Sequence, residues 1–259
     1  MNGMSSISKF TYEEYERFIE HARNIAPICA LRDWKGKNGI ILRHDVDFDV
    51  ESARRLSLVE KKMEVPSTYF VMASNRYYNP LFPSNSKLLL ALARDGFEVG
   101  LHFDPSIYGN IPASELEEKM KLECSILESA IGEPIESVSL HNPSLSGQYP
   151  MFKGYHNAYS TEIFSDENYM SDSCMGFRGK DPYEFVKKAS KMPLQMVFHP
   201  MHWSEKGDDY IDYFTNYILE LTDYMDDTMR VNQKYKELIG NTRLVDSIAR
   251  GINDRNKNK

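Results

Sequence analysis

Residues 40–47 constrain this chain more than any other segment, because an apolar run turns abruptly charged there. Successive side chains of an extended strand point to opposite faces, so Arg43, Asp45 and Asp47 would share one face, with His44 and Val46 on the other. Two carboxylates and a guanidinium are costly to bury unless they pair, bind a cation or take part in chemistry. The segment therefore predicts a strand that ends in a functional site, and hydrolytic metal chemistry is the leading interpretation.

A structural role for these carboxylates is the alternative. Aspartates often follow strands, since Asp accepts turn geometry and can cap the next helix. Asp49 stands directly before a helical pattern and suits that role. A cap needs only one carboxylate, so it leaves Asp45 and Asp47 unexplained.

Length and composition fit one globular domain. A chain of 259 residues suits an α/β barrel with an ample core. Its 41% hydrophobic and 27% charged residues exclude a largely disordered protein. We expect a single domain over residues 1–259, with a helical lead-in at 1–38, a core at 39–203, C-terminal helices at 208–252 and a frayed tail at 253–259.

Charge and targeting signals narrow the function classes. A formal net charge of -7 argues against nucleic acid as the main partner, because phosphate binding relies on clustered Lys and Arg. Cys29, Cys124 and Cys174 lack paired spacing and are expected to be reduced core thiols. The chain shows neither a secretory leader nor the roughly 20 apolar residues of a transmembrane segment. We expect a cytoplasmic location.

Strand and helix patterns alternate along the chain. Strands are expected at 40–47, 67–72, 97–102, 135–140 and 194–198, and helices at 11–23, 50–63, 86–94, 112–131, 182–190 and 210–238. This order predicts a mostly parallel sheet, closed or nearly closed into a barrel. Residues 144–181 are expected to form long loops with a brief strand-like piece at 162–164. The aromatic stripe of residues 210–238 is predicted to face the core.

Polar side chains collect where the predicted strands end. They are Asp45 with Asp47, His102 with Asp104, His141 with Asn142, and His199 with His202. A single histidine of this kind is more often structural, but the carboxyl ends of parallel strands meet at one rim, where α/β folds assemble their sites. His21 and His156 match no strand end and are left unassigned.

The residue types at this rim suggest a metal. A mixed Asp and His set without Cys suits a catalytic Zn²⁺ or similar divalent ion, with three protein ligands and an open position. Such an ion lowers the pKa of a water, a carboxylate can take its proton, and a facing histidinium can protonate the leaving group. The set predicts hydrolysis of an amide or ester.

At these residues the sequence resembles a known family. Residues 42–47, 100–102, 141–143 and 198–200 with Trp203 are similar, in order and spacing, to the polysaccharide deacetylases of the NodB-homology type, carbohydrate esterase family 4. More narrowly they resemble a bacterial subgroup associated with O-antigen and surface-polysaccharide gene clusters. The resemblance covers about residues 40–203.

The resemblance implies a distorted (β/α) barrel of about seven mostly parallel strands and metal-dependent removal of acyl groups from sugars. It makes Asp45 the catalytic base, Asp47 and His102 metal ligands, and His199 the general acid. His141 stands where the family usually has an arginine that orients the base. Arg43, on the same strand face as Asp45, could supply that guanidinium instead.

One position departs from the family pattern. The family has a second metal-binding histidine four residues after the first, but Ser106 stands four residues after His102. We predict His141 as the third ligand; Asp104 is the alternative, or the site binds metal weakly or not at all.

Four further residues are expected to bind or orient the substrate. They are Asp104, Asn142, His202 and Trp203, the last two at the rim, where an aromatic ring can stack on a sugar face.

Three functions stay open at this point. The first is a deacetylase of a nucleotide- or lipid-linked amino sugar or glycan precursor in surface-polysaccharide biosynthesis. The second is an inactive barrel that serves as a binding or scaffold component of polysaccharide assembly, which the missing histidine favours. A phosphoester hydrolase is disfavoured, because the chain lacks a Gly-rich phosphate loop or an Arg cluster.

Overall fold

The chain forms two compact units, described by a computed structural model of residues 6–257. The first unit extends to Gly207 and contains the sheet; the second begins at Asp208 and contains the C-terminal helices. The sequence predicts that the C-terminal helices belong to the same domain as the sheet. In the structure they form a compact unit of their own.

The first unit is built on a parallel sheet. Its strands within the described residues are β1 (Ile28–Cys29), β2 (Gly39–Val46), β3 (Thr68–Val71), β4 (Glu98–Phe103), β5 (Ser137–Leu140), β6 (His156–Asn157), β7 (Tyr169–Ser171) and β8 (Pro193–Phe198). Seven run in the order β6-β5-β4-β3-β2-β8-β7, β1 also pairs with β2, and every pair between them is parallel. Because β6 and β7 lie at opposite ends of this order, the barrel is open. The predicted distorted (β/α) barrel is confirmed.

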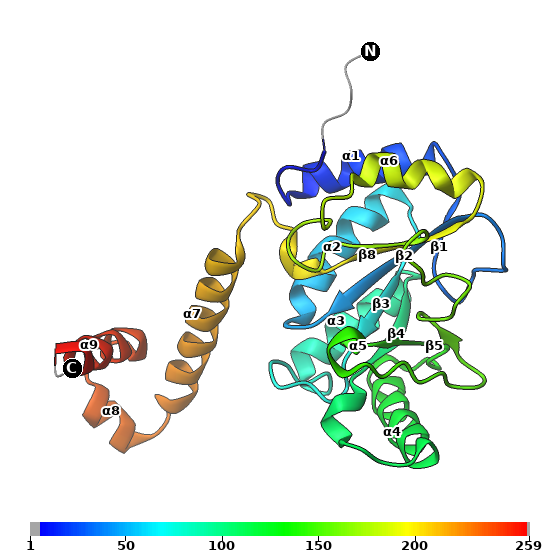
Figure 1. Cartoon of the computed structure of the whole chain (residues 1–259). Coiled ribbons are helices and arrows are strands. Elements are labelled where there is room, and N and C mark those ends of the chain that lie inside the picture. The colour runs from blue at the N-terminus through cyan, green and yellow to red at the C-terminus, as the bar shows by residue number, and fades with distance from the viewer. Residues whose placement is uncertain (1–5, 258–259) are drawn as a thin grey trace. The chain divides into compact units, whose positions relative to one another are not determined.

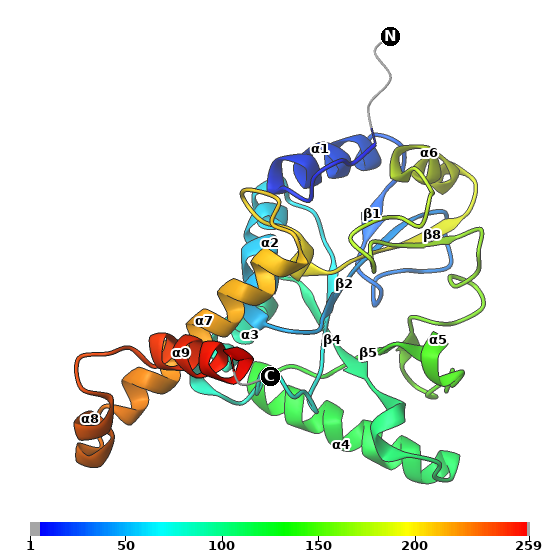
Figure 2. The ribbon, with the colours of Figure 1, turned by 60° about the vertical axis from the view of Figure 1, so that its left-hand side comes forward.

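Helices pack around this sheet (Figure 1). They are α1 (Tyr12–Arg23), α2 (Val50–Met63), α3 (Pro83–Arg94), α4 (Ala113–Ile131), α5 (Pro143–Ser146) and α6 (Pro182–Val186), with the short 3-10 helices η1 (Pro105–Tyr108), η2 (Lys187–Ser190) and η3 (Pro200–His202). Helices α1 to α4 pack against one another in succession, and Figure 2 shows α2 and α3 together on one side of β2 with α5 on the other. The expected helices and most expected strands of this unit are present.

Local signals in the sequence explain two of these boundaries. The Asp49 side chain accepts a hydrogen bond from the Ser52 backbone at 2.5 Å and caps α2, as predicted. Gly132 ends α4 in the left-handed region at φ 75°, which a glycine adopts without steric cost.

Strand β2 runs through the middle of the sheet with all of its residues buried. Its side chains alternate as predicted, because Arg43 reaches Asp45 on one face while His44 points to the other. There the Nε2 of His44 lies 2.8 Å from Glu60, whose carboxylate also accepts hydrogen bonds from three hydroxyls. These donors are Tyr15, Ser67 and Tyr69, at 2.5, 2.6 and 2.7 Å. This network ties α1, α2 and β3 to the back of β2, while Nδ1 of His44 is buried without a hydrogen-bond partner among the described residues.

The segment between β5 and β8 differs in part from the prediction. The expected strand-like piece at 162–164 is a turn with no strand pairing, and strands form at β6 and β7 instead. Both are only two or three residues long, too short for a recognisable alternation. The expectation of core thiols is wrong for Cys174, which is exposed in this segment, while Cys124 is buried and Cys29 half-buried.

The second unit differs more. The predicted helix at 210–238 is two helices, α7 (Tyr210–Met229) and α8 (Gln233–Ile239), followed by α9 (Leu244–Lys257). Its aromatic and aliphatic stripe does not face a core: Ile218, Leu221 and Tyr224 are 59%, 47% and 56% exposed. The expected tail is helical to Lys257, and residues 258–259 lie outside the described part. Within residues 6–257, every helix is too short or too polar to cross a membrane.

Close packing of β3 against β4 generates a prediction about stability. A Cβ at Gly100 would lie 2.5 Å from Cε1 of the buried Phe70 ring and 3.0 Å from the Ser137 carbonyl oxygen. Gly100→Ala should therefore lower the free energy of unfolding, measured in urea, by about 1–3 kcal/mol. Gly176→Ala is the matched control, because its Cβ would meet nothing closer than 3.8 Å. Equal losses in the two variants would contradict this account of the β3–β4 contact.

Candidate active site

A pocket of about 370 Å³ lies at the carboxyl ends of the parallel strands. Five of the predicted residues line it. They are Asp45 in β2, Asp47 directly after β2, His102 in β4, His141 after β5 and His199 after β8. The strands carry these side chains to one edge because they run in the same direction. Four separated stretches of sequence thus meet in one pocket.

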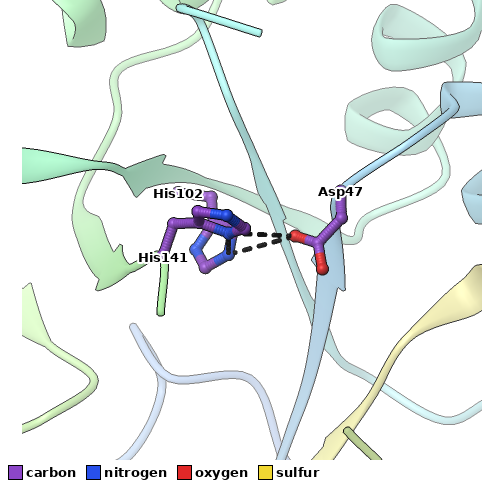
Figure 3. A group of neighbouring side chains, drawn as sticks. All are labelled: Asp47, His102 and His141. Carbon is purple, nitrogen blue, oxygen red and sulfur yellow. Dashed lines mark hydrogen bonds and ion pairs between the residues drawn. The ribbon is translucent and has the colours of Figure 1, made fainter. Parts of the chain in front are cut away.

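Asp47 lies at the centre of the histidines. Its Oδ1 is 3.3 Å from Nε2 of His102 and 3.5 Å from Nδ1 of His141, as Figure 3 shows. Its Oδ2 is 3.8 Å from Nε2 of His199. Burial alone would raise the pKa of Asp47, but the three histidines outweigh it and hold this pKa well below its ordinary value. The carboxylate is therefore ionised, as a metal ligand must be.

Asp47, His102 and His141 fit a divalent metal ion. Their ligand atoms lie within 4.8 Å of one another, so one ion could contact all three. Oδ1 of Asp47 is buried, faces both rings and has no hydrogen-bond partner of good geometry among the described residues. Two imidazoles and a carboxylate, with no thiol, are a ligand set typical of catalytic zinc. The site can hold the ion that the sequence predicted.

Asp45 is held by Arg43. Nε and Nη2 of the guanidinium donate to the two carboxylate oxygens of Asp45, each at 2.8 Å. Burial would raise the pKa of Asp45, but the Arg43 charge outweighs it and lowers this pKa. The pairing expected from strand alternation is present.

Arg43 is itself fixed on all sides, although it is fully buried. It donates to Gln195 at 3.2 Å and to the hydroxyl of Ser139. Its guanidinium lies 5.2 Å from the Phe70 ring centre and 4.9 Å from that of Tyr159. Because Arg43 is fixed by these contacts and holds both oxygens of Asp45, the Asp45 carboxylate is also fixed in the pocket.

His199 is paired with a carboxylate that sequence reasoning missed. Nδ1 of His199 lies 2.6 Å from Oδ1 of Asp172, and the backbone amide of His199 donates to the same oxygen at 3.0 Å. Burial would lower the pKa of His199, but the charge and hydrogen bond of Asp172 raise it to about 9. The Asp172 carboxylate therefore favours the protonated form of His199, whose Nε2 lies 3.8 Å from Oδ2 of Asp47.

Asp172 follows β7, and its signal was the same strand-end pattern found elsewhere. The strand before it has only three residues, Tyr169–Ser171, within a Tyr- and Ser-rich stretch, so its end could not be located from residue spacing. Without a recognisable strand before it, nothing in the sequence distinguishes Asp172 from other aspartates in loops.

Two residues expected at the rim lie elsewhere. His202 and Trp203 are only 3% and 2% exposed, and neither lines the pocket. The short helix η3 turns them under the site, where Nε1 of Trp203 donates to Asp172 at 3.0 Å and Nδ1 of His202 lies 3.2 Å from the same carboxylate. The expectation that they contact a sugar is wrong; they hold Asp172.

The other predicted residues divide between the pocket and its surroundings. Asn142 lines the pocket, and its amide nitrogen lies 2.9 Å from Nε2 of His141. Asp104 does not line the pocket, because its carboxylate caps η1 by accepting from the backbone and hydroxyl of Ser106 at 2.9 and 2.6 Å. Of the two candidates for the third ligand, only His141 belongs to the cluster.

Comparison with known proteins gives a limited likeness. No family model and no curated protein matches the chain. A CE4 family pseudoenzyme from Bacillus anthracis is similar in structure, with 14% identity, a TM-score of 0.46 and coverage of 71% of this chain and 62% of that one. The chain therefore spans less than two thirds of that protein's length.

Two solved deacetylases are similar to the same degree. A chitin deacetylase from the fungal pathogen Colletotrichum lindemuthianum has 14% identity and a TM-score of 0.45, over 70% of this chain and 81% of its own. A peptidoglycan deacetylase from Bacillus subtilis has 17% identity and a TM-score of 0.42, over 78% and 96%. Likeness at this level carries no argument about activity.

The Asp172–His199 pair generates a prediction about pH. In the metal-free protein, the His199 imidazole should titrate near pH 9 by NMR, and Asp172→Asn should move its pKa down toward the ordinary 6.5. Because the folded pKa is the higher one, this pair's contribution to stability is complete below about pH 6.5 and is lost as the pH rises through 9.

Asp166→Asn is the control for this titration. Asp166 lines the same pocket but is not among the groups that raise the pKa of His199. A His199 that still titrates near pH 9 in Asp172→Asn would show that another group holds its proton.

Proposed function

We propose that this chain is a metal-dependent hydrolase that removes an acetyl group from a sugar or glycan precursor, in surface-polysaccharide biosynthesis. One observation carries the proposal: the metal-ligand side chains share one pocket with Asp45, which Arg43 holds, and with His199, which is paired with Asp172. A base and an acid whose environments push their pKa values apart are what hydrolysis of an amide or ester needs.

Each side chain has a role in this proposal. Asp47, His102 and His141 would hold the ion, zinc being the best match to the ligand types, and a bound ion supplies Lewis acidity toward the carbonyl oxygen and water. Asp45 accepts the proton of the attacking water; a carboxylate oxygen has two lone pairs, so its bond to Arg43 leaves one available. His199 gives its proton to the departing amine or alkoxide, and Asp172 keeps that proton in place at neutral pH.

The walls of the pocket suit a sugar. Tyr149, Tyr159 and Phe164 line it, and their rings are in mutual contact with centroids 4.6–5.8 Å apart. Aromatic faces of this kind stack on the apolar faces of sugar rings. A nucleotide- or lipid-linked amino sugar as substrate, relatedness to the O-antigen subgroup of family 4 and a cytoplasmic location are part of the same proposal.

An inactive binding or scaffold barrel is the second candidate. Ser106 occupies the place of the second family histidine and bonds to Asp104 rather than facing the pocket. Both oxygens of Asp45 are also engaged by Arg43, an arrangement that a purely structural ion pair would share.

Release of acetate distinguishes the two candidates. The purified protein, loaded with zinc, should release acetate from at least one member of a panel of acetylated amino-sugar nucleotides and glycans. Asp45→Asn should lower the rate about 100-fold or more, because it removes the base while keeping the shape of the side chain. Chelation should abolish release, and added zinc should restore it.

Asp104→Asn is the matched control, since Asp104 has the same side chain and lies outside the cluster. Its rate should stay within about twofold of wild type, the factor left by modest surface effects. Equal release by wild type and Asp45→Asn would remove Asp45 as the base. No release from any substrate, together with tight sugar binding, would favour the scaffold.

A further inference from the structure

One wall of the pocket carries two cations that the hydrolytic chemistry does not use. Arg178 and Lys180 line the pocket from the segment between β7 and α6, and both are exposed. Among residues 6–257, neither forms an ion pair with a carboxylate, whereas Arg43 in the same region is neutralised by Asp45. The proposed chemistry accounts for Asp45, Asp47 and His199 and leaves these two charges unexplained.

The partners of both cations are neutral. Nη2 of Arg178 donates to the hydroxyl of Ser173 at 3.0 Å. The Nζ of Lys180 donates to the backbone oxygen of Asp166 at 3.0 Å and lies 5.7 Å from the ring centre of Phe185. A hydroxyl, a carbonyl and a ring hold the two charged groups in position but leave their charge available to an anion.

The backbone directs Arg178 into this position. Arg178 has φ 51°, in the left-handed region that residues with a side chain seldom adopt. The residue before it, Phe177, is buried in the apolar cluster with Phe198 and also lines the pocket. The turn is therefore anchored by a ring, and the guanidinium that follows lies at the pocket wall.

The acidic groups of the pocket do not cancel these charges. Asp45 is paired with Arg43, and Asp47 faces three histidines. Asp166 is the remaining carboxylate among the lining residues. Its single negative charge is smaller than the combined positive charge of Arg178 and Lys180. A net positive wall in a chain of net charge -7 is a local arrangement rather than a property of the whole surface.

The dimensions leave room for more than one chemical group. A volume of about 370 Å³ falls in the range, roughly 300–1,000 Å³, of pockets that enclose ligands of drug size. The rings of Tyr149 and Phe164 provide a sugar-stacking wall, and the hydrolytic side chains lie in the same pocket. A sugar with an attached anionic group would meet all three features.

We propose that Arg178 and Lys180 bind a phosphate or diphosphate attached to the sugar, so that the substrate is an acetylated sugar phosphate rather than a neutral glycan. The inference rests on the proposed deacetylase function and assigns two residues to the phosphate of its substrate. Two carriers share this chemistry, a nucleoside diphosphate and a lipid diphosphate, and the phosphate next to the sugar is common to both. Guanidinium and ammonium groups recognise that phosphate through charge-assisted hydrogen bonds.

Calorimetric binding to the zinc-loaded Asp45→Asn protein tests this without turnover. The probes are UDP-N-acetylglucosamine, N-acetylglucosamine linked to a short prenyl diphosphate, and neutral N-acetylglucosamine. Both charged probes should bind at least tenfold more tightly than the neutral one. Arg178→Gln and Lys180→Gln should each weaken the charged probes about tenfold and leave the neutral probe unchanged.

Lys188→Gln is the matched control. Lys188 also lies over the Phe185 ring, at 5.0 Å, and donates to a backbone oxygen at 3.3 Å, but it does not line the pocket. It should leave all three affinities unchanged, and the tighter of the two charged probes identifies the carrier.

Three results would overturn the inference. They are equal affinity for charged and neutral probes, an effect of Lys188→Gln as large as that of Arg178→Gln, and no binding of either charged probe. Binding with the expected preference but no acetate release from the matching wild-type protein would retain the phosphate site and reject the deacetylase.

Discussion

The buried pair of Arg43 and Asp45 is the interaction on which the rest of the structure depends. β2 lies at the centre of the sheet, between β3 and β8, with every residue buried, so its charged side chains could not stay there unpaired. The bidentate bond and the contacts of Arg43 with Gln195 and Ser139 satisfy both charges. With these charges paired, β2 can lie in the core and place Asp47, the residue after it, in the pocket.

The two carboxylates at the end of β2 differ in their surroundings. Arg43 fixes Asp45, whereas Asp47 is shared by His102, His141 and His199. A third carboxylate, Asp172, pairs with Nδ1 of His199 and raises the pKa of this histidine. The residues proposed as base, metal ligand and acid therefore come from one strand end and its neighbours.

Sequence periodicity located most of this arrangement. Asp49 as a cap, α2, the strand that carries His102 and the strand that ends before His199 follow from local signals, which act within a few residues. Asp172 was missed because its strand is too short to show alternation. Trp203 and the stripe on α7 were misjudged because burial depends on contacts between distant segments, which residue spacing does not encode.

The metal ligands are the central claim, and X-ray absorption at the zinc edge tests them most directly. After loading with one equivalent of Zn²⁺ and removal of unbound ion, the spectrum should show two imidazole nitrogens at about 2.0–2.1 Å and a carboxylate oxygen. His141→Ala should lose one of the nitrogens, while His156→Ala, which alters a β6 residue outside the ligand cluster, should match wild type. A His141→Ala spectrum identical to wild type, or less than about a tenth of an equivalent retained by wild type, would contradict the account.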